Sequence, residues 1–237
     1  MISHLCQTGY VGKRQESRKQ IEARIVELGR RHLVDRGPAG LSLRAIARDL
    51  GMVSSAVYRY VSSRDELLNL LLVDSYSDLA NAVDRARDAV AEPWSEDVSA
   101  IARATRRWAV AHPAQWALLY GSPVPGYHAP PERTNEVGTR VVRAIFEAIA
   151  AGIATGDIRL TNTVAPQPMS SDFERLRQLF GFPGDDSVVA KCFLFWAGVL
   201  GAISLEVFGQ YGVDTLTDPE AVFETQLRLL VDILAQP

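Results

Sequence analysis

The sequence predicts an all-helical protein, with an N-terminal three-helix helix-turn-helix domain and a larger C-terminal helical domain. Apolar residues near the N-terminus recur at the i, i+3, i+4, i+7 spacing of one buried helical stripe: Leu43, Ile46, Ala47 and Leu50. We find no convincing strand pattern and no internal repeat along the chain. The two parts of the chain also carry opposite net charge, as expected of two domains with different partners.

The first helix is predicted from about residue 15 to residue 35. Its inner face is marked by apolar residues at helical spacing: Ile21, Ile25, Leu28 and Leu33. Gly37 and Pro38 end the helix. Residues 1–14 are expected to form a frayed terminal arm.

The second and third helices are predicted from their capping residues. Ser42 suits the N-cap of the second helix, and Gly51 suits its end because glycine readily adopts the left-handed conformation. A third, short helix is expected over residues 54–60. Two helices joined by a short turn with glycine form a helix-turn-helix, whose second helix fits the major groove of DNA. This segment therefore indicates a DNA-binding protein.

The fourth helix is predicted to begin near residue 64 and to reach about residue 90, with Asp65 and Glu66 in its first turn, where the helix dipole favours acids. We place the domain boundary here, giving a DNA-binding domain over 15–64 and a larger helical domain over 65–237. Later helices are expected over about 94–111, 114–120, 131–155, 172–179, 186–210 and 218–235. Loops are expected at 121–131 and 156–170.

The basic charge is concentrated in the predicted DNA-binding part. Residues 1–64 hold 12 Lys and Arg against 5 Asp and Glu, a net charge of +7, whereas the remaining residues carry −10. A basic N-terminal part followed by an acidic remainder is expected of a phosphate-binding domain joined to a regulatory domain. A solvated basic helix surface is the alternative interpretation.

Composition excludes several classes. Apolar content of 47% and charged content of 22% are ordinary for a soluble globular protein. The most apolar stretch, residues 192–208, is short and contains Glu206, so we expect a buried helix rather than a membrane span. The N-terminus lacks the apolar core of a signal peptide. We expect a cytoplasmic protein.

The sequence shows no pattern of catalysis or metal binding. Cys6 and Cys192 are too few and too distant for a disulfide scaffold, and the four histidines lack ligand spacing. There is no glycine-rich phosphate loop, and residues 121–123 do not match a nucleophile elbow. We therefore expect no enzyme activity, no cofactor and no metal.

The N-terminal pattern resembles the tetracycline-repressor-like (TetR) family of bacterial transcription regulators. The matching residues span 36–68: Arg36-Gly37, Ser42-Leu43-Arg44, Ala47, Leu50-Gly51, Val57-Tyr58-Arg59-Tyr60-Val61, Arg64 and Leu67-Leu68. Val53 departs from the polar cap that many members have there, and Arg64 replaces a frequent lysine. Three later segments resemble the subgroup with a WHG-type C-terminal domain: 107–113, 121–127 and 196–206. The resemblance implies a body that binds a small molecule and pairs with a second subunit.

The predicted DNA-binding residues lie on and around the helix-turn-helix: Ser42, Arg44, Ser54, Ser55, Tyr58, Arg59, Tyr60 and Arg64. Tyr58 suits a phosphate hydrogen bond, with a half-buried core tyrosine as the alternative. Arg59 suits either a guanine edge or the DNA backbone. Ser42 is better explained as a helix cap than as a phosphate contact, and Tyr60 suits either face.

The last two helices are predicted to form a homodimer interface of four helices. The expected residues are strongly apolar: Val189, Cys192, Phe193, Trp196, Leu200, Ile203, Phe223, Leu227, Leu230 and Leu234. Gly198 and Gly201 leave room for another helix to approach. Packing of both helices within one subunit is the alternative.

A small-molecule pocket is expected between the fourth and eighth helices, lined by aromatic residues and one polar residue: Trp108, Trp116, Tyr120, Tyr127, His128, Phe146 and Trp196. Plain core packing is the alternative for each. The predicted function is that of a homodimeric repressor that an unknown ligand releases from a palindromic double-stranded DNA operator. A ligand-independent regulator or a non-specific, architectural DNA-binding protein is the alternative.

Overall fold

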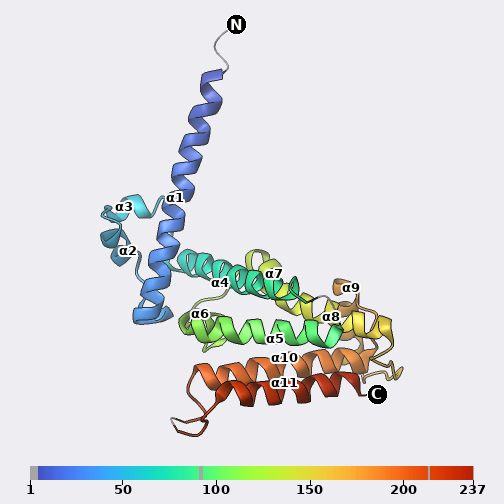
Figure 1. The fold of residues 1–237 in the computed structure, drawn as a ribbon. Coiled ribbons are helices and arrows are strands. Elements are labelled where there is room, and N and C mark those ends of the chain that lie inside the picture. Colours follow the sequence, from blue (N-terminus) through green and yellow to red (C-terminus); the bar gives the residue numbers. More distant parts are fainter. Residues whose placement is uncertain (1–4, 91–92, 213, 237) are drawn as a thin grey trace. The chain divides into compact units, whose positions relative to one another are not determined.

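The computed structural model describes residues 5–90, 93–212 and 214–236, and these residues are helical with no strand (Figure 1). The first helix, α1, spans Leu5–Arg36. It begins earlier than expected, so residues 5–14 of the predicted frayed arm are helical, while residues 1–4 lie outside the described residues. The early turns hold two glycines, which weaken helix propensity and hide this extension from the sequence.

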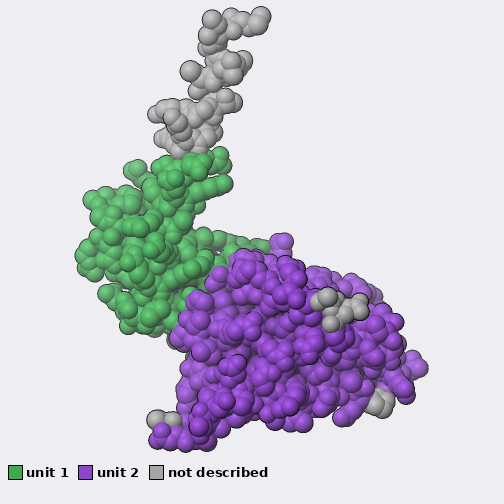
Figure 2. Space-filling model, in the orientation of Figure 1, with its two compact units in different colours: residues 1–76, 114–135 green, residues 77–113, 136–237 purple. Residues whose placement is uncertain are grey.

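The chain divides into two compact units (Figure 2). Unit 1 comprises residues 1–76 and 114–135, and unit 2 comprises residues 77–113 and 136–237. Packing thus groups residues 65–76 and 114–135 with the predicted DNA-binding domain.

Unit 1 is built on the predicted helix-turn-helix. After α1 come a short 3-10 turn, Pro38–Gly40, then α2 (Leu43–Asp49), α3 (Ser54–Val57) and the start of α4 (Arg64–Arg87). These helices share one core of buried residues, which includes the predicted stripes: Ile25, Leu28, Leu33, Leu43, Ile46, Ala47, Val57, Leu67, Leu68 and Leu71. The second segment of unit 1 holds α6 (Pro113–Tyr120) and the start of α7 (Pro131–Gly138).

The caps of the helix-turn-helix follow the sequence only in part. Ser42 caps α2, because its Oγ accepts a hydrogen bond from Ala45 N at 3.4 Å. Gly51 adopts the left-handed conformation that the turn requires, with φ 67°. The predicted helix over 54–60 is shorter, because α3 ends at Val57 and continues to Tyr60 as turns. Val53, at the N-cap of α3, makes no side-chain hydrogen bond, so the first turn of α3 lacks the stabilisation that a capping side chain provides.

Unit 2 is a helical bundle. It contains the end of α4 together with α5 (Trp94–Ala111), α8 (Arg140–Thr155), α9 (Met169–Phe180), α10 (Asp186–Val207) and α11 (Pro219–Ala235). Helix α5 packs against α8 and α10, and α10 runs beside α11 (Figure 1). The single helix expected over 131–155 is broken into α7 and α8, because Gly138 and Thr139 interrupt it.

Helix α10 is apolar around most of its circumference. By length and composition it is the one helix among the described residues that could cross a membrane, with a mean hydropathy of 2.0, yet only 33% of its most apolar window is buried. The prediction of a buried helix is thus met on one face only. Glu206 on α10 accepts two hydrogen bonds from Arg106 of α5, at 2.7 and 2.8 Å. This half-buried ion pair ties α10 into the bundle.

Candidate nucleic-acid interface

Helix α3 and the turn that follows it, residues 58–60, present most of their predicted DNA-binding side chains outward. Val57 is fully buried and anchors α3 on the core of unit 1. Around it, Ser55 and Arg59 are exposed, Ser54 is half-buried, and Tyr58 keeps 45% of its surface accessible. An anchored short helix with hydroxyl, phenol and guanidinium groups facing outward can contact phosphates and base edges together.

The residues flanking α3 divide between exposed and structural positions. Arg44 is exposed at the start of α2, while Ser42 is half-buried and occupied as the cap. Tyr60 is half-buried, and the guanidinium of Arg18 lies 5.8 Å from its ring centroid. Arg64 donates from Nη2 to the carbonyl oxygen of Pro38 at 2.8 Å, so this guanidinium supports the turn before α2.

Some basic residues of the N-terminal part are held in ion pairs. Arg30 of α1 donates to both carboxylate oxygens of Asp74 on α4, at 2.5 and 2.6 Å. His32 is buried and lies 2.6 Å from Asp49 at the end of α2. The hydrogen bond with His32 lowers the pKa of the Asp49 carboxyl. These pairs lock α1 to α2 and α4, so the net charge of +7 overstates the charge available to DNA.

A segment from the middle of the chain is fastened to the N-terminal part of α4. Tyr127 donates its hydroxyl to Asn69 Oδ1 at 2.5 Å, and Arg133 donates to Glu66 Oε2 at 2.6 Å. Asn69 in turn donates to Glu66 at 3.4 Å. We call these four residues the clasp. Burial raises the pKa of the Tyr127 phenol, so it stays protonated and remains a donor at neutral pH.

The predicted ligand-pocket residues do not form one set. Trp116, Tyr120, Tyr127 and His128 belong to unit 1, whereas Trp108, Phe146 and Trp196 belong to unit 2. Trp116 is fully buried and His128 is exposed. Trp108 donates from Nε1 to Asp78 at 2.9 Å and stacks on His112. Phe146 and Trp196 line a common cavity within unit 2.

The residues predicted at the dimer interface also lie in two environments. Six are buried inside unit 2 and form part of its core: Val189, Cys192, Ile203, Phe223, Leu227 and Leu234. Trp196, Leu200 and Leu230 are half-buried, and Phe193 is 50% exposed. Among the described residues, no group of three or more His, Cys, Asp or Glu is placed to hold a metal ion.

The fold and this surface define a helix-turn-helix DNA-binding protein. Two family descriptions match the chain: "Bacterial regulatory proteins, tetR family" over residues 25–71, and "Tetracyclin repressor-like, C-terminal domain" over residues 98–230. The chain is 77% identical over 233 residues to the HTH-type transcriptional regulators Rv1816 of Mycobacterium tuberculosis and Mb1846 of Mycobacterium bovis, covering 98% of this chain and 100% of each relative.

The fold agrees with these matches. The crystal structure of the regulatory protein SCO4313 is similar with a TM-score of 0.75 at 30% identity, covering 92% of this chain and 98% of that one. The chain therefore belongs to the tetR family of bacterial regulatory proteins. It is a DNA-binding transcriptional regulator and not an enzyme, in agreement with the sequence prediction.

Proposed function

We propose that the protein is a cytoplasmic, homodimeric repressor that binds a palindromic operator through α3 and leaves it when a small molecule binds unit 2. The observation that carries the proposal is the outward face of α3. Ser55, Tyr58 and Arg59 are exposed around the buried anchor Val57, so they can reach DNA without unfolding the core.

The homodimer is supported by an exposed apolar stripe along α10 and its C-cap, Phe208. It consists of exposed residues at helical spacing: Ala190, Phe193, Leu194, Ala197, Gly201, Leu205 and Phe208. We call this set the α10 stripe. A Cβ added at Gly201 meets no atom within 4 Å, whereas one at Gly198 lies 2.8 Å from Leu230 on α11. Gly198 thus serves packing within the subunit, and Gly201 leaves space for a second copy.

A dimer also meets a requirement of DNA recognition. The exposed part of α3 is only one to two turns long, so one subunit reads few base pairs. Two copies related by a two-fold axis can read half-sites about one helical turn apart, roughly 34–36 Å. The operator is then an inverted repeat.

The clasp supports coupling between a ligand and DNA. Residues 114–135 pack in unit 1. The chain connects this segment to α5 on its N-terminal side and, through α7, to α8 on its C-terminal side. A ligand that favours one arrangement of these helices therefore acts on a segment that Tyr127 and Arg133 tie to α4. The change in DNA affinity equals the ligand's differential affinity for the two arrangements.

Selection of bound fragments from random double-stranded DNA tests the proposal, at about 150 mM salt because phosphate contacts depend on ionic strength. We expect an inverted repeat, bound about 10³-fold or more tightly than random DNA. An architectural protein, the competing candidate, would bind all fragments alike. Recovery of no motif would therefore reject the proposal in favour of non-specific binding.

A further inference from the structure

An apolar cavity lies within unit 2, apart from the predicted DNA-binding surface. Its volume is about 250 Å³, and its walls come from α8, α9 and α10. Ile145 and Phe146 form the buried floor, while Leu179 and Phe193 are 61% and 50% exposed and form the rim. The cavity therefore opens to solvent at one side and ends on the core of the bundle.

The lining offers no charge to a ligand. Thr139 is a polar member of the wall, and its hydroxyl already donates to the carbonyl oxygen of Glu136 at 3.3 Å. Burial raises the pKa of the Cys192 thiol to about 12, so it is neutral at physiological pH. Arg143 lies near the wall but places its guanidinium 5.1 Å from the Phe180 ring centroid. None of the ten lining residues carries a charge that would offset the lost hydration of a buried ion.

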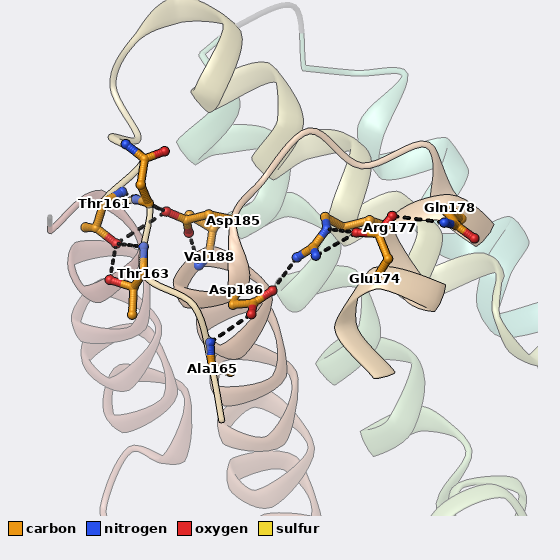
Figure 3. Close-up of polar contacts among 10 residues, drawn as sticks. Thr161, Thr163, Ala165, Glu174, Arg177, Gln178, Asp185, Asp186 and Val188 are labelled. Carbon is orange, nitrogen blue, oxygen red and sulfur yellow. Dashed lines mark hydrogen bonds and ion pairs between the residues drawn. The ribbon is translucent and has the colours of Figure 1, made fainter. Parts of the chain in front are cut away.

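Polar contacts join α9 and the loop before it to the start of α10 (Figure 3). Asp186, which is buried at the start of α10, accepts from Arg177 of α9 at 2.5 Å and from the backbone N–H of Ala165 at 2.8 Å. The neighbouring Asp185 caps α10 through Val188 N and accepts from the backbone of the loop at Thr161. These contacts fasten α9, which carries part of the cavity wall, to the start of α10.

The size of the cavity limits the occupant. A dry cavity of about 150 Å³ with an aliphatic and aromatic lining holds benzene, so about 250 Å³ accommodates about ten carbon atoms. Phe146, Phe180 and Trp196 line it, and aromatic faces favour a flat partner ring.

We propose that this cavity binds a neutral, apolar, ring-containing molecule of about ten carbon atoms. The inference rests on the proposed function, since it assigns the class of small molecule that the regulator senses. Phe193 belongs both to the cavity rim and to the α10 stripe. Its ring stacks on that of Phe173 of α9, with the two ring centroids 6.0 Å apart. An occupant that shifts Phe193 therefore acts directly on the proposed dimer surface.

The test measures binding of naphthalene to the full-length protein without DNA, by ligand-observed NMR and calorimetry, with 2-naphthoate as the charged counterpart. We expect naphthalene to bind, and 2-naphthoate to bind at least about tenfold more weakly because its carboxylate must be desolvated. Val142→Trp fills the cavity from α8 and should weaken naphthalene binding by about tenfold or more. Val110→Trp, at an exposed position of α5, is the matched control and should bind as the wild type does.

Leu179→Glu provides a second variant that the fold tolerates, because this side chain is exposed at the rim. It should also weaken naphthalene binding while leaving thermal unfolding unchanged. Equal binding to wild type and both cavity variants would overturn the proposal, as would stronger binding of 2-naphthoate. Binding only to a dissociated subunit would show that a second copy fills the cavity, and would overturn it too. The DNA selection is independent of these results, so the two proposals fail separately.

Discussion

Charge substitutions at two neighbouring glycines of α10 should separate dimerisation from folding. Gly201 faces open space within the subunit, and Gly198 faces Leu230 at 2.8 Å from an added Cβ. Gly201→Glu should therefore leave the subunit folded and dissociate the dimer. Gly198→Glu should instead disturb packing within the subunit, because its side chain displaces the Leu230 methyl groups between α10 and α11.

The magnitude follows from the exposed side chains of the α10 stripe. Phe193 and Leu194 are 50% exposed, Phe208 is 39% and Leu205 is 37% exposed. Since full burial of such a side chain contributes about 1.5–3 kcal/mol, covering the remainder gives about 1 kcal/mol each, or about 8 kcal/mol for two subunits. Association costs offset much of this gain, which leaves an interface that one buried carboxylate can break.

Sedimentation analysis of the wild type, Gly201→Glu and Ala154→Glu gives the result directly. Ala154 is exposed on α8, outside the α10 stripe, so it controls for the added charge. We expect Gly201→Glu to weaken dimerisation by at least about 100-fold, or about 2.7 kcal/mol, and to leave the helix content of the subunit unchanged by circular dichroism. An unchanged dimer in this variant would show that the α10 stripe lies outside the interface.

Three further changes test other parts of the structure. Tyr127→Phe removes the hydrogen bond to the buried Asn69 and should lower the free energy of unfolding, measured by urea titration, by about 1–2 kcal/mol. An unchanged free energy of unfolding would show that the clasp does not stabilise the fold. The bond from Arg177 lowers the pKa of Asp186 to about 2, so the unfolded chain binds protons more readily there. This stabilising contribution is complete above about pH 4 and is lost as the pH falls through about 2. Asp186→Asn should therefore lose stability at neutral pH and flatten the acid limb of a thermal-unfolding profile, unlike Asp172→Asn on the exposed side of α9. Arg30→Ala should lower stability by about 1 kcal/mol or less, since the Arg30 side chain is 38% exposed.

Local signals predicted much of the fold. The bounds of α5 follow from Pro93 and from His112 before Pro113, and the helix-turn-helix follows from Ser42 and Gly51. These are short-range effects of proline, glycine and capping side chains, so the sequence alone determines them. The two glycines in the early turns of α1 conceal its start, and the break at Thr139 has no side-chain capping bond to mark it.

Non-local contacts could not be predicted in the same way. The bond between Tyr127 and Asn69 joins residues 58 positions apart, and no local pattern reports it. Helix α10 is apolar nearly all round, so its periodicity does not reveal which face the subunit buries. The Asp185 cap of α10 did have a signal, because an acid three residues before Val188 is a common N-cap arrangement.

Equilibrium DNA binding of Arg59→Ala tests whether α3 and the turn after it read a specific DNA sequence. Wild type, Arg59→Ala and Arg107→Ala would be titrated with the selected fragment and with a scrambled fragment of equal length. Arg107 is exposed on α5 of unit 2, so its loss controls for the change in net charge. We predict that Arg59→Ala alone loses about 1–3 kcal/mol on the selected fragment. Equal affinities of all three proteins for both fragments would contradict the assignment of α3 as the recognition helix.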